Sequence, residues 1–552
     1  MPGICLRACG QPSATIEHDL SEMLAALCHH EGYRVERWAD DARHIALGRV
    51  SLGFVNTATQ PVHSSDRRHT AVLAGELYDV AELSRQLNIK SVSGGPSHAE
   101  LLLAGYLQHG DDFLRRLNGI FAGAVWSADN QSLTLISDRF GMKPLFYVHR
   151  PGRLTAAAEI KSLLLDHDVP RGEDLGGMAQ FFSFGHLFGD STLLESVRVL
   201  PPASILTYNL RTDQLALRRY WALPTGEQSG ESVGQQSEAS WLAAIDEAFV
   251  AAVERATADN DHLGLALSGG LDARSVLAAV DTRRTRLKSI SLGVPGSLDH
   301  RCAAKLAALS GCEHFQYNLD GSVCDSDSYR RSLQRMVHLS DGQYLDQAIV
   351  MPMLPTIQKL GMQVLLRGHA GELMHMNKAY NFSLDAAAWE IRDDAGLEQW
   401  LMSRLCGWML NGVPEPLLCR ATSAQVQELA RTSLRQCLAE SADVKPTVHR
   451  IWHLFIRQRL ARETSISLAM INSVAETRVP ILDARLIELL LTAPPQMKVG
   501  DAIQTFMLRR HRPELLGVVN ANTGAPMGAG PLRQKLATLK MKVLAKLGVP
   551  GY

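Results

Sequence analysis

A glycine-rich turn between an apolar run and a helical pattern is the feature of this sequence best suited to chemistry. Residues 265–280 read LALSGGLDARSVLAAV, so the apolar run stops at two glycines and an aspartate before a helical pattern begins. A strand that ends in such a turn exposes backbone N–H groups, and the start of the next helix adds partial positive charge. The turn therefore predicts a phosphate-binding loop built from Ser268, Gly269 and Gly270. Two other phosphate-binding patterns, GxxxxGK followed by Ser or Thr and GxGxxG, do not match it.

The elements around this turn divide the chain into two parts. Residues 224–240, PTGEQSGESVGQQSEAS, are polar and rich in glycine and serine, which is typical of a linker. Before them, short alternating runs such as HTAVLAGELYD predict antiparallel strands. After them, strand-like LGLAL and LKSISLGV alternate with helical patterns, and this alternation predicts a parallel sheet. From about residue 385 onward, helical patterns dominate.

The last helical pattern, residues 530–548, is basic. It reads GPLRQKLATLKMKVLAKLG, with five basic residues, no acidic residue and apolar residues at helical spacing. We expect this helix to cover the core, and a helix that lies on a membrane surface is the alternative interpretation.

Composition limits the classes of function. The chain has 552 residues, so two or more domains are expected. Lys plus Arg is 56 and Asp plus Glu is 57, a balance that gives no reason to expect a nucleic-acid partner. Nine cysteines without a CxxC pair indicate neither a zinc site nor a redox site. We expect a cytoplasmic protein, since no signal peptide and no membrane-spanning segment is evident.

Five segments, in order along the chain, carry a resemblance to a known family. LSGGLDAR resembles the SGGxDS pyrophosphate loop of the asparagine synthetase class B family. The other four segments also resemble motifs of that family: GELYD (75–79), DRFGMKPLFY (138–147), AAEIKSLL (157–164) and ETRVPILD (476–483). The chain is therefore identified as a member of this family from matches that span nearly its whole length.

The resemblance implies an α/β fold combined with α+β. Residues 1–223 are expected to form a four-layer αββα sandwich of the nucleophile-hydrolase type, and residues 224–240 the linker. Residues 241–552 are expected to form a parallel-sheet adenine-nucleotide alpha-hydrolase domain with a helical C-terminal part. Such enzymes use ATP and Mg²⁺ to adenylate a carboxylate substrate. Ammonia or an amine then attacks, giving an amide, AMP and pyrophosphate.

The same resemblance assigns the site residues. Asp272 falls on the aspartate that holds magnesium, and oxygen ligands suit this ion. The segment LRGHAGEL places Gly368 and His369 on a second motif of the family, with Glu372 at a second magnesium aspartate. His369 is a candidate base for the attacking amine. Gly293 and Gly368 complete the predicted nucleotide-binding set.

Each assignment has a plainer interpretation. Asp272 could be a helix N-cap, Glu372 an acid favoured at a helix start, and His369 a structural histidine. Two further positions depart from the family: Ala273 replaces a serine of the loop, although Ser275 lies nearby. Asn522 stands at the position of a lysine that stabilises charge. Lys498 or a nearby arginine such as Arg509 is a candidate substitute.

The motifs for glutamine hydrolysis are altered. The family's nucleophile is an N-terminal cysteine exposed by removal of Met, whereas this chain begins Met1-Pro2, and proline has no thiol. Ala74 replaces the asparagine that forms the oxyanion hole, and His98 replaces the aspartate that holds the glutamine amine. Arg49 remains. We therefore expect no glutamine hydrolysis and a structural role for the N-terminal domain.

Three functional hypotheses follow. The first is an amide-forming ligase that takes ammonia or an amine without using glutamine. The second is an intramolecular amide cyclase, since beta-lactam synthetases and lasso-peptide cyclases resemble this family. The third is a catalytically impaired protein that binds nucleotide or a partner. A hydrolase that uses the first domain is disfavoured by Pro2. The sequence leaves the substrate and the oligomeric state open.

Overall fold

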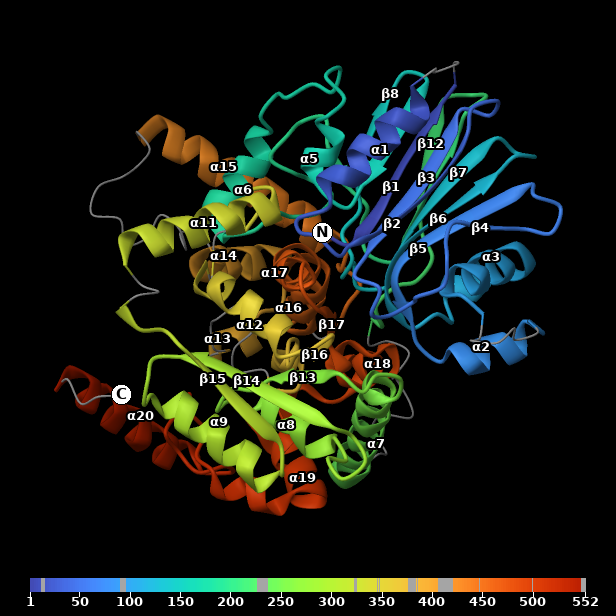
Figure 1. Cartoon of the computed structure of the whole chain (residues 1–552). Helices are drawn as coiled ribbons and strands as arrows, with labels where there is room; N and C mark the ends of the chain where they lie inside the picture. Colours follow the sequence, from blue (N-terminus) through green and yellow to red (C-terminus); the bar gives the residue numbers. More distant parts are fainter. Residues whose placement is uncertain are drawn as a thin grey trace.

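A computed structural model describes the chain except for residues 11–14, 90–95, 226–236, 322–324, 345, 347, 376–383, 385, 406–419, 446, 499 and 548–552. The first part of the chain builds two antiparallel sheets, and the second part builds a parallel sheet surrounded by helices (Figure 1). Most of the linker predicted at residues 224–240 lies outside the described residues.

The N-terminal unit is a sandwich of two six-stranded antiparallel sheets, ordered β10-β8-β9-β1-β3-β2 and β12-β11-β7-β6-β5-β4. The strands of the first sheet are β1 (Gly3–Cys9), β2 (Arg34–Asp40), β3 (Ile45–Ser51), β8 (Phe146–Arg150), β9 (Arg153–Ala157) and β10 (Arg198–Val199). Those of the second are β4 (Val62–His63), β5 (His69–Leu77), β6 (Gly119–Ser127), β7 (Ser132–Ser137), β11 (Ser204–Asn209) and β12 (Gln214–Arg219).

Helices cover both outer faces of this sandwich. Along β1, Ile4 and Leu6 point toward the second sheet while Cys5 and Cys9 belong to the cluster that includes α1, as the alternation of side chains along a strand requires. Helices α1 (Ile16–Ala26) and α5 (Ile160–Leu163) cover the first sheet. Helix α3 (His98–His109) covers the second, with α2 (Val80–Gln86) and α4 (Asp111–Leu114) packed on α3. The predicted four-layer αββα arrangement is confirmed.

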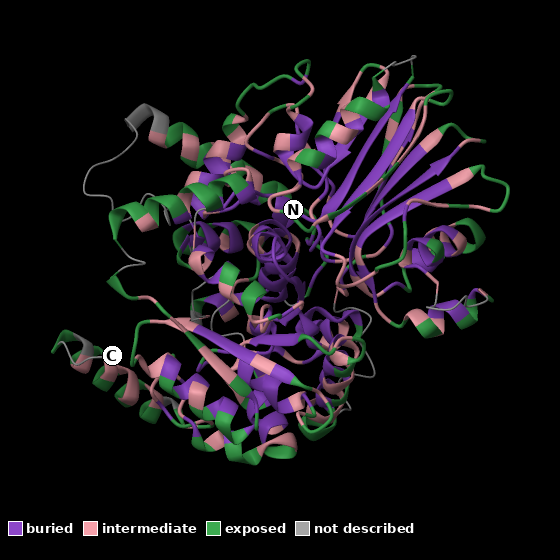
Figure 2. Ribbon diagram, viewed as in Figure 1, coloured by how far each residue is buried: buried purple, intermediate pink, exposed green. Residues whose placement is uncertain are grey.

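The C-terminal unit is organised around a five-stranded parallel sheet, ordered β15-β14-β13-β16-β17. Its strands are β13 (Leu263–Ala266), β14 (Leu287–Gly293), β15 (Glu313–Asn318), β16 (Val364–Leu366) and β17 (Glu476–Arg478). Around it lie α7 (Glu238–Thr257), α8 (Asp272–Ala279), α9 (Leu298–Leu309) and α19 (Ala502–His511). The parallel sheet inferred from alternating strands and helices is confirmed, and the sheet interior is buried (Figure 2).

The remaining helices pack between the two units and along the outer side of the C-terminal one (Figure 1). They are α6 (Leu175–Phe184), α11 (Ser326–Ser340), α12 (Leu354–Lys359), α13 (Ala386–Glu390), α14 (Asp394–Leu405), α15 (Arg420–Ala439), α16 (His449–Leu454), α17 (Ser465–Ile471), α18 (Ala484–Thr492) and α20 (Pro531–Lys546). A π-helical segment, η6 (Phe455–Thr464), joins α16 to α17, and a short 3₁₀ turn, η4 (Gly371–Leu373), follows β16. Within the described part of the chain, none of the helices has the length and apolar character needed to cross a membrane.

Buried ion pairs join the two units. Arg478 on β17 forms two 2.6 Å contacts with the carboxylate of Glu76 on β5. Two residues earlier on β17, Glu476 accepts from the Lys143 ammonium at 3.1 Å. Asp483 accepts from Asn118 at 2.7 Å. The segments GELYD, DRFGMKPLFY and ETRVPILD therefore meet at the junction between the units.

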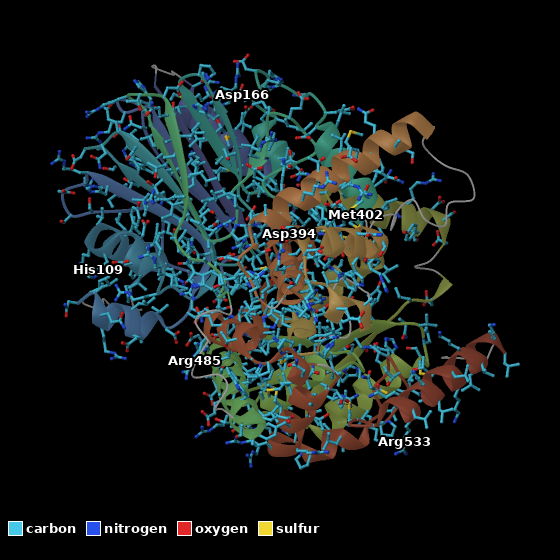
Figure 3. The ribbon with its side chains drawn as sticks, turned by 180° about the vertical axis from the view of Figure 1, so that it is seen from behind. His109, Asp166, Asp394, Met402, Arg485 and Arg533 are labelled. Carbon is cyan, nitrogen blue, oxygen red and sulfur yellow. The ribbon has the colours of Figure 1, made fainter. Side chains whose placement is uncertain are left out.

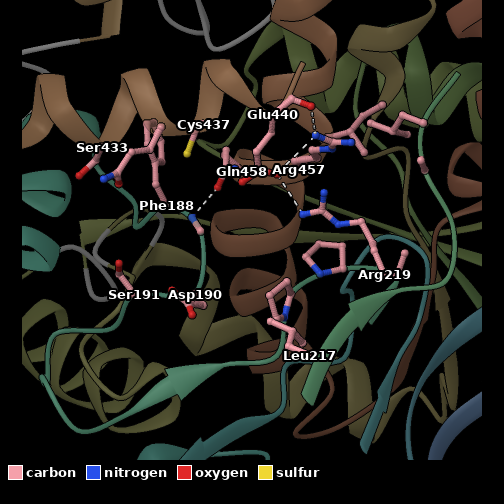
Figure 4. Close-up of a pocket in the computed structure, with 18 of the residues that line it drawn as sticks. Phe188, Asp190, Ser191, Leu217, Arg219, Ser433, Cys437, Glu440, Arg457 and Gln458 are labelled. Atoms are coloured by element: carbon pink, nitrogen blue, oxygen red, sulfur yellow. Dashed lines mark hydrogen bonds and ion pairs between the residues drawn. The ribbon is translucent and has the colours of Figure 1, made fainter. Parts of the chain in front are cut away.

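A second polar junction borders a cavity of about 340 Å³ between the sandwich and helices of the C-terminal unit (Figure 4). Arg219 from β12 and Arg457 from η6 both contact the carboxylate of Glu440, at 3.0 and 3.4 Å. On another wall, the Gly189 N–H donates to Gln458 at 2.7 Å. The Gly189 backbone of the N-terminal unit and Glu440 of the C-terminal unit thus both contact η6 along this cavity.

Three buried histidines and the partly buried His98 make the fold sensitive to acid. Burial lowers the pKa of His98 and His453 to about 4, and that of His186 and His449 to about 3. In the unfolded chain a histidine titrates near pH 6.5, so between about pH 6.5 and pH 4 the unfolded state binds more protons than the folded state. The stability contributed by these uncharged histidines is therefore complete above pH 6.5 and declines as the pH falls toward 4.

We expect His98→Asn to reduce this acid sensitivity. The asparagine oxygen can accept the Leu77 N–H that now donates to His98 Nδ1 at 2.8 Å, so the fold keeps that bond. At about pH 5 the lowered pKa of His98 costs roughly 2 kcal/mol, so the drop in melting temperature between about pH 7.5 and pH 5 should shrink by a few degrees. His109→Asn is the control, because His109 is exposed at the end of α3 (Figure 3). An equal drop in melting temperature in His98→Asn and in the wild type would contradict the prediction.

Candidate active site

The candidate site lies where the strand order of the parallel sheet reverses. The chain leaves β13 toward β14 on one side and later returns to form β16 on the other side, with Leu265 opposite Leu366. In open parallel sheets, ligands bind at this switch point, beyond the carboxyl ends of the strands. The turn at 268–272 follows β13 and the segment 368–372 follows β16, so the structure brings these two predicted segments together.

Asp272 is held at this switch point by two side chains that the sequence did not indicate. Its Oδ1 accepts from Gln504 of α19 at 2.8 Å and lies 3.1 Å from Nε2 of His375. The Asp272 side chain is 29% exposed, so it remains open to a ligand. The N-cap interpretation is wrong, because Leu271 occupies the cap position and Asp272 is the first residue of α8.

Two glycines allow the segment after β16 to approach Asp272. A Cβ atom placed on Gly371 would lie 2.0 Å from the Asp272 carboxyl carbon. A Cβ on Gly368 would lie 2.7 Å from the backbone nitrogen of Ala273. Since real Cβ atoms do not come this close to other atoms, both positions require glycine for steric reasons.

Glu372 follows directly and shares this space with Asp272. Burial raises the pKa of Glu372, and the negative charge of Asp272 raises it further, while Arg459 and His375 oppose the shift. Two neighbouring carboxylates that repel each other attract a cation, and their oxygens are the ligands that Mg²⁺ prefers. Across the described ranges, no group of three or more His, Cys, Asp or Glu residues could hold a metal. The residues fit a Mg²⁺ ion that takes its other ligands from phosphate and water.

The predicted phosphate loop follows β13 and contacts an internal carboxylate. The N–H of Gly269 donates to Asp299 of α9 at 2.8 Å, and the N–H of Gly270 donates to Ser268 Oγ at 3.3 Å. Burial raises the pKa of Asp299. A carboxylate that accepts a loop N–H shows directly that this backbone can bind anionic oxygen. Gly293 ends the neighbouring strand β14. A Cβ added to Gly293 would lie 3.1 Å from Nε2 of His300, which is on α9 like Asp299.

Arg274 fixes the shape of this loop. Its buried guanidinium donates to the carbonyl of Gly269 at 3.0 Å and to the carbonyls of Val518 and Val519 at 2.6 and 2.8 Å. Burial lowers the pKa of Arg274 to about 10, so it keeps its charge at neutral pH. The sequence motifs did not predict this role, although a charged residue inside a buried helical pattern was a usable signal.

The departures from the family pattern have clear positions. Ser275 does not replace the hydroxyl missing at Ala273, because its Oγ donates back to the Leu271 carbonyl at 3.0 Å. Asn522 lies beside the loop, with Nδ2 3.5 Å from a Cβ placed on Gly270. Lys498 is not a substitute charge there: it is buried, it donates to the Leu490 carbonyl, and burial lowers its pKa to about 7.

His369 lies next to two arginines. Arg367 Nε donates to His369 Nδ1 at 3.4 Å. Burial lowers the pKa of His369 well below its ordinary value, and the charges of Arg367 and Arg459 lower it further. A neutral imidazole whose Nδ1 accepts carries its proton on Nε2. In this arrangement His369 offers a hydrogen-bond donor, and it can act as a base at Nε2 only after changing tautomer.

The residues around Pro2 leave almost no space. Met1, Pro2, Ala74, Ala122 and further residues line a cavity of about 10 Å³, roughly one water molecule. Arg49 is already engaged: it donates to Glu36 at 2.7 Å and to the Asn56 carbonyl at 2.9 Å. A larger cavity of about 1180 Å³ lies nearby, lined by residues that include Asn56, Glu76, His98 and Arg478.

Cys5 does not replace the missing thiol. Its side chain is fully buried, and burial raises its pKa far above the ordinary value for a thiol. The thiolate, which is the reactive form, is therefore scarce at neutral pH. The interpretation of Cys5 and Cys9 as buried thiols agrees with both being free and buried.

Fold and site together define a protein with two domain types. Residues 1–221 match the glutamine amidotransferase domain model and residues 244–515 match the asparagine synthase model. Asparagine synthetase 1 (glutamine-hydrolyzing) of Bacillus subtilis is 23% identical over 531 residues, which cover 90% of this chain and 81% of the relative. The chain belongs to the asparagine synthetase class B family.

Two other relatives match a smaller part. Asparagine synthetase 3 (glutamine-hydrolyzing) of Bacillus subtilis is 28% identical over 241 residues, 43% of this chain and 38% of the relative. Amidase chyE of Penicillium rubens is 30% identical over 272 residues, 47% of this chain and 38% of the relative. The chain thus spans well under two thirds of the length of these two proteins.

The contact between Gly371 and Asp272 can be tested by adding one methyl group. We expect Gly371→Ala to displace the Asp272 carboxylate and to weaken binding of ATP with Mg²⁺ about tenfold or more, measured by isothermal titration calorimetry. Gly517→Ala is the matched control, because an added Cβ there meets no atom within 4 Å. Unchanged binding in Gly371→Ala would show that Asp272 does not need its present position.

Proposed function

We propose that the chain is an asparagine-synthetase-like ligase that forms amide bonds at the β13/β16 switch point. It adenylates a carboxylate with ATP and Mg²⁺, and it transfers the acyl group to ammonia or an amine with release of AMP and pyrophosphate. The observation that carries the proposal is the pairing of Asp272 with Glu372 beside a loop that already binds a carboxylate oxygen.

The roles follow from the contacts. Asp272 and Glu372 would hold Mg²⁺, which when bound supplies positive charge to the phosphates. The N–H groups of Gly269 and Gly270 would bind phosphate oxygens, with Asp299 giving way to them. Arg459, which is paired with Glu463 at 3.1 Å, contributes positive charge near both Glu372 and His369. Gln504 and His375 orient Asp272.

His369 is proposed to handle the proton of the attacking amine. An ammonium ion must lose a proton before it can attack a carbonyl carbon. The lowered pKa of His369 keeps its imidazole uncharged, so it does not repel an incoming ammonium ion. The bond from Arg367 favours donation from Nε2, so this role requires the tautomer to change as the amine binds.

Glutamine is proposed not to serve as the nitrogen source. Pro2 has no thiol and lines a cavity that holds about one water molecule, and Cys5 is buried. Ala74 offers no amide side chain for an oxyanion hole. The N-terminal domain instead contributes Glu76 and Lys143 to the buried junction with β17.

Two alternatives remain tied to particular observations. An intramolecular cyclase would use the same site and would need no added amine. A nucleotide-binding protein without catalysis is favoured by Ala273 and by Asn522, which places an amide where the family has a charge. Both alternatives are distinguished from the ligase by the assay below.

The assay measures pyrophosphate release over a panel of carboxylates, with ATP and Mg²⁺, with and without ammonium, and with glutamine as the control. We expect release with a suitable carboxylate, and no stimulation or hydrolysis of glutamine. A product lighter than the substrate by one water without added amine would identify the cyclase. Binding of ATP without release for any carboxylate would contradict the ligase.

Variants of Asp272 and Glu372, the proposed metal ligands, test the mechanism in the same pyrophosphate assay. We expect Asp272→Asn and Glu372→Gln each to lower pyrophosphate release about a hundredfold or more, because each removes a negative oxygen ligand. Asp261→Asn, an exposed residue just before β13, is the control and should behave as the wild type. Full activity in either site variant would remove the basis for the proposed mechanism.

A further inference from the structure

Helix α20 leaves a row of large apolar side chains uncovered. Leu532 and Leu547 are each 73% exposed, Leu536 is 59%, Leu539 is 58% and Val543 is 47% exposed. Successive spacings of four, three, four and four residues place all five on one stripe of the helix. Burial colouring shows exposed and intermediate residues along this helix at the edge of the molecule (Figures 1 and 2).

The opposite face of α20 attaches the helix to the protein. The Met541 sulfur lies 2.5 Å from a Cβ placed on Gly524, so this side chain packs directly on that glycine. Thr538 Oγ1 donates to the Thr523 carbonyl at 3.4 Å, and Gln534 Nε2 donates to the Ala529 carbonyl at 2.9 Å. The helix therefore turns its leucine stripe outward, whereas residues 530–548 were predicted to cover the core.

Basic residues flank the stripe on both sides. At 100° per residue, Lys535, Lys542 and Lys546 fall along one border of the stripe, and Arg533 and Lys540 along the other. Residues 531–547 contain no acidic residue, although the whole chain has a net charge of −1. Arg533 lies at the outer edge of the molecule in the reverse view (Figure 3). The charge is thus concentrated around the apolar stripe.

We propose that this surface, the α20 stripe of Leu532, Leu536, Leu539, Val543 and Leu547 with its five basic neighbours, docks on an anionic lipid surface. A helix with an apolar stripe and basic borders lies in the membrane interface, where the leucines enter the acyl boundary and the long basic side chains reach lipid phosphates. A second copy of the chain fits poorly, because two such stripes would bring ten positive charges together.

Docking through α20 would orient the candidate site. Residues 523–529 beneath α20 continue directly from Asn522 and Ala521, and the Ala521 N–H donates to the Gly269 carbonyl of the phosphate loop at 3.0 Å. The edge of the C-terminal unit that carries this loop would therefore face the lipid surface. This inference does not depend on the proposed ligase activity, because binding is measured without substrate.

Vesicle sedimentation with the full chain tests the proposal. Vesicles of phosphatidylcholine alone are compared with vesicles that also contain phosphatidylglycerol, each at low and high salt. We expect binding to the anionic vesicles to be about tenfold tighter or more, and to weaken as salt screens the charges. Equal binding to both vesicle types, or none, would overturn the proposal. Binding to polyglutamate but not to vesicles would indicate an acidic protein partner instead.

Variants in α20 separate this surface from other sites on the chain. The triple change Leu536→Ser, Leu539→Ser and Val543→Ser should abolish sedimentation with anionic vesicles. Leu175→Ser is the control, because Leu175 on α6 is 58% exposed, the same fraction as Leu539. Wild-type binding by the triple variant would overturn the proposal.

A charge-reversal pair provides an independent test that leaves the leucines intact. Lys540→Glu with Lys542→Glu should weaken binding to anionic vesicles about tenfold or more. Lys305→Glu with Arg330→Glu, two exposed residues on α9 and α11, makes the same change in net charge elsewhere and should have little effect. Circular dichroism and the melting temperature confirm that each variant is folded. An equal loss in both pairs would show attraction by net charge alone and would overturn the assignment to α20.

Discussion

The parallel pairing of β13 with β16 is the constraint on which the candidate site depends. Because Leu265 lies opposite Leu366, the two strands end at the same level and their following turns must share one space. That space is so tight that Gly371 has no room for a Cβ beside the Asp272 carboxyl group. The two carboxylates, far apart in sequence, therefore meet through backbone geometry and not through an attraction between them. Their mutual repulsion is the property that suits them to a cation.

The junction between the two units transmits this constraint to the N-terminal domain. Glu476 and Arg478 lie two residues apart on β17, so both side chains point to the same face. Because β17 pairs with β16, the strand that precedes Gly368 is the direct neighbour of the strand that forms the ion pairs with Lys143 and Glu76. Removing one partner of a buried pair leaves an uncompensated charge, which typically costs about 3–5 kcal/mol. The contribution of the N-terminal domain to holding the sheet that carries the site therefore does not require glutamine hydrolysis.

The sequence predicts the local parts of this arrangement better than the contacts between them. The apolar run, glycine turn and helical pattern at 265–280 correctly place β13, the turn and α8, because each depends on neighbouring residues. Strand alternation likewise predicts the parallel sheet. The contacts of Gln504 with Asp272 could not be predicted, since they join α19 to α8 without a motif or spacing that links them.

The surroundings of Asp299 and Lys498 are also set by the packing of distant segments. Asp299 looks like an ordinary acid near a helix start, and only the position of α9 brings it to the Gly269 N–H. Lys498 looked like a spare charge, but packing buries it near the Trp452 ring, 5.7 Å from the ring centroid. Burial decides whether such a charge is available to a ligand, and burial is a property of the whole fold.

Asn522 and Arg459 determine where positive charge is found at the candidate site. The phosphate loop has an amide beside it at Asn522, so the positive charge expected there is not supplied by that residue. The charge of Arg459 acts on both Glu372 and His369, and Arg459 is itself paired with Glu463 at 3.1 Å. Arg459 belongs to η6, and the neighbouring Gln458 accepts from the Gly189 N–H of the N-terminal unit. The N-terminal unit therefore also contacts the segment that carries this positive charge.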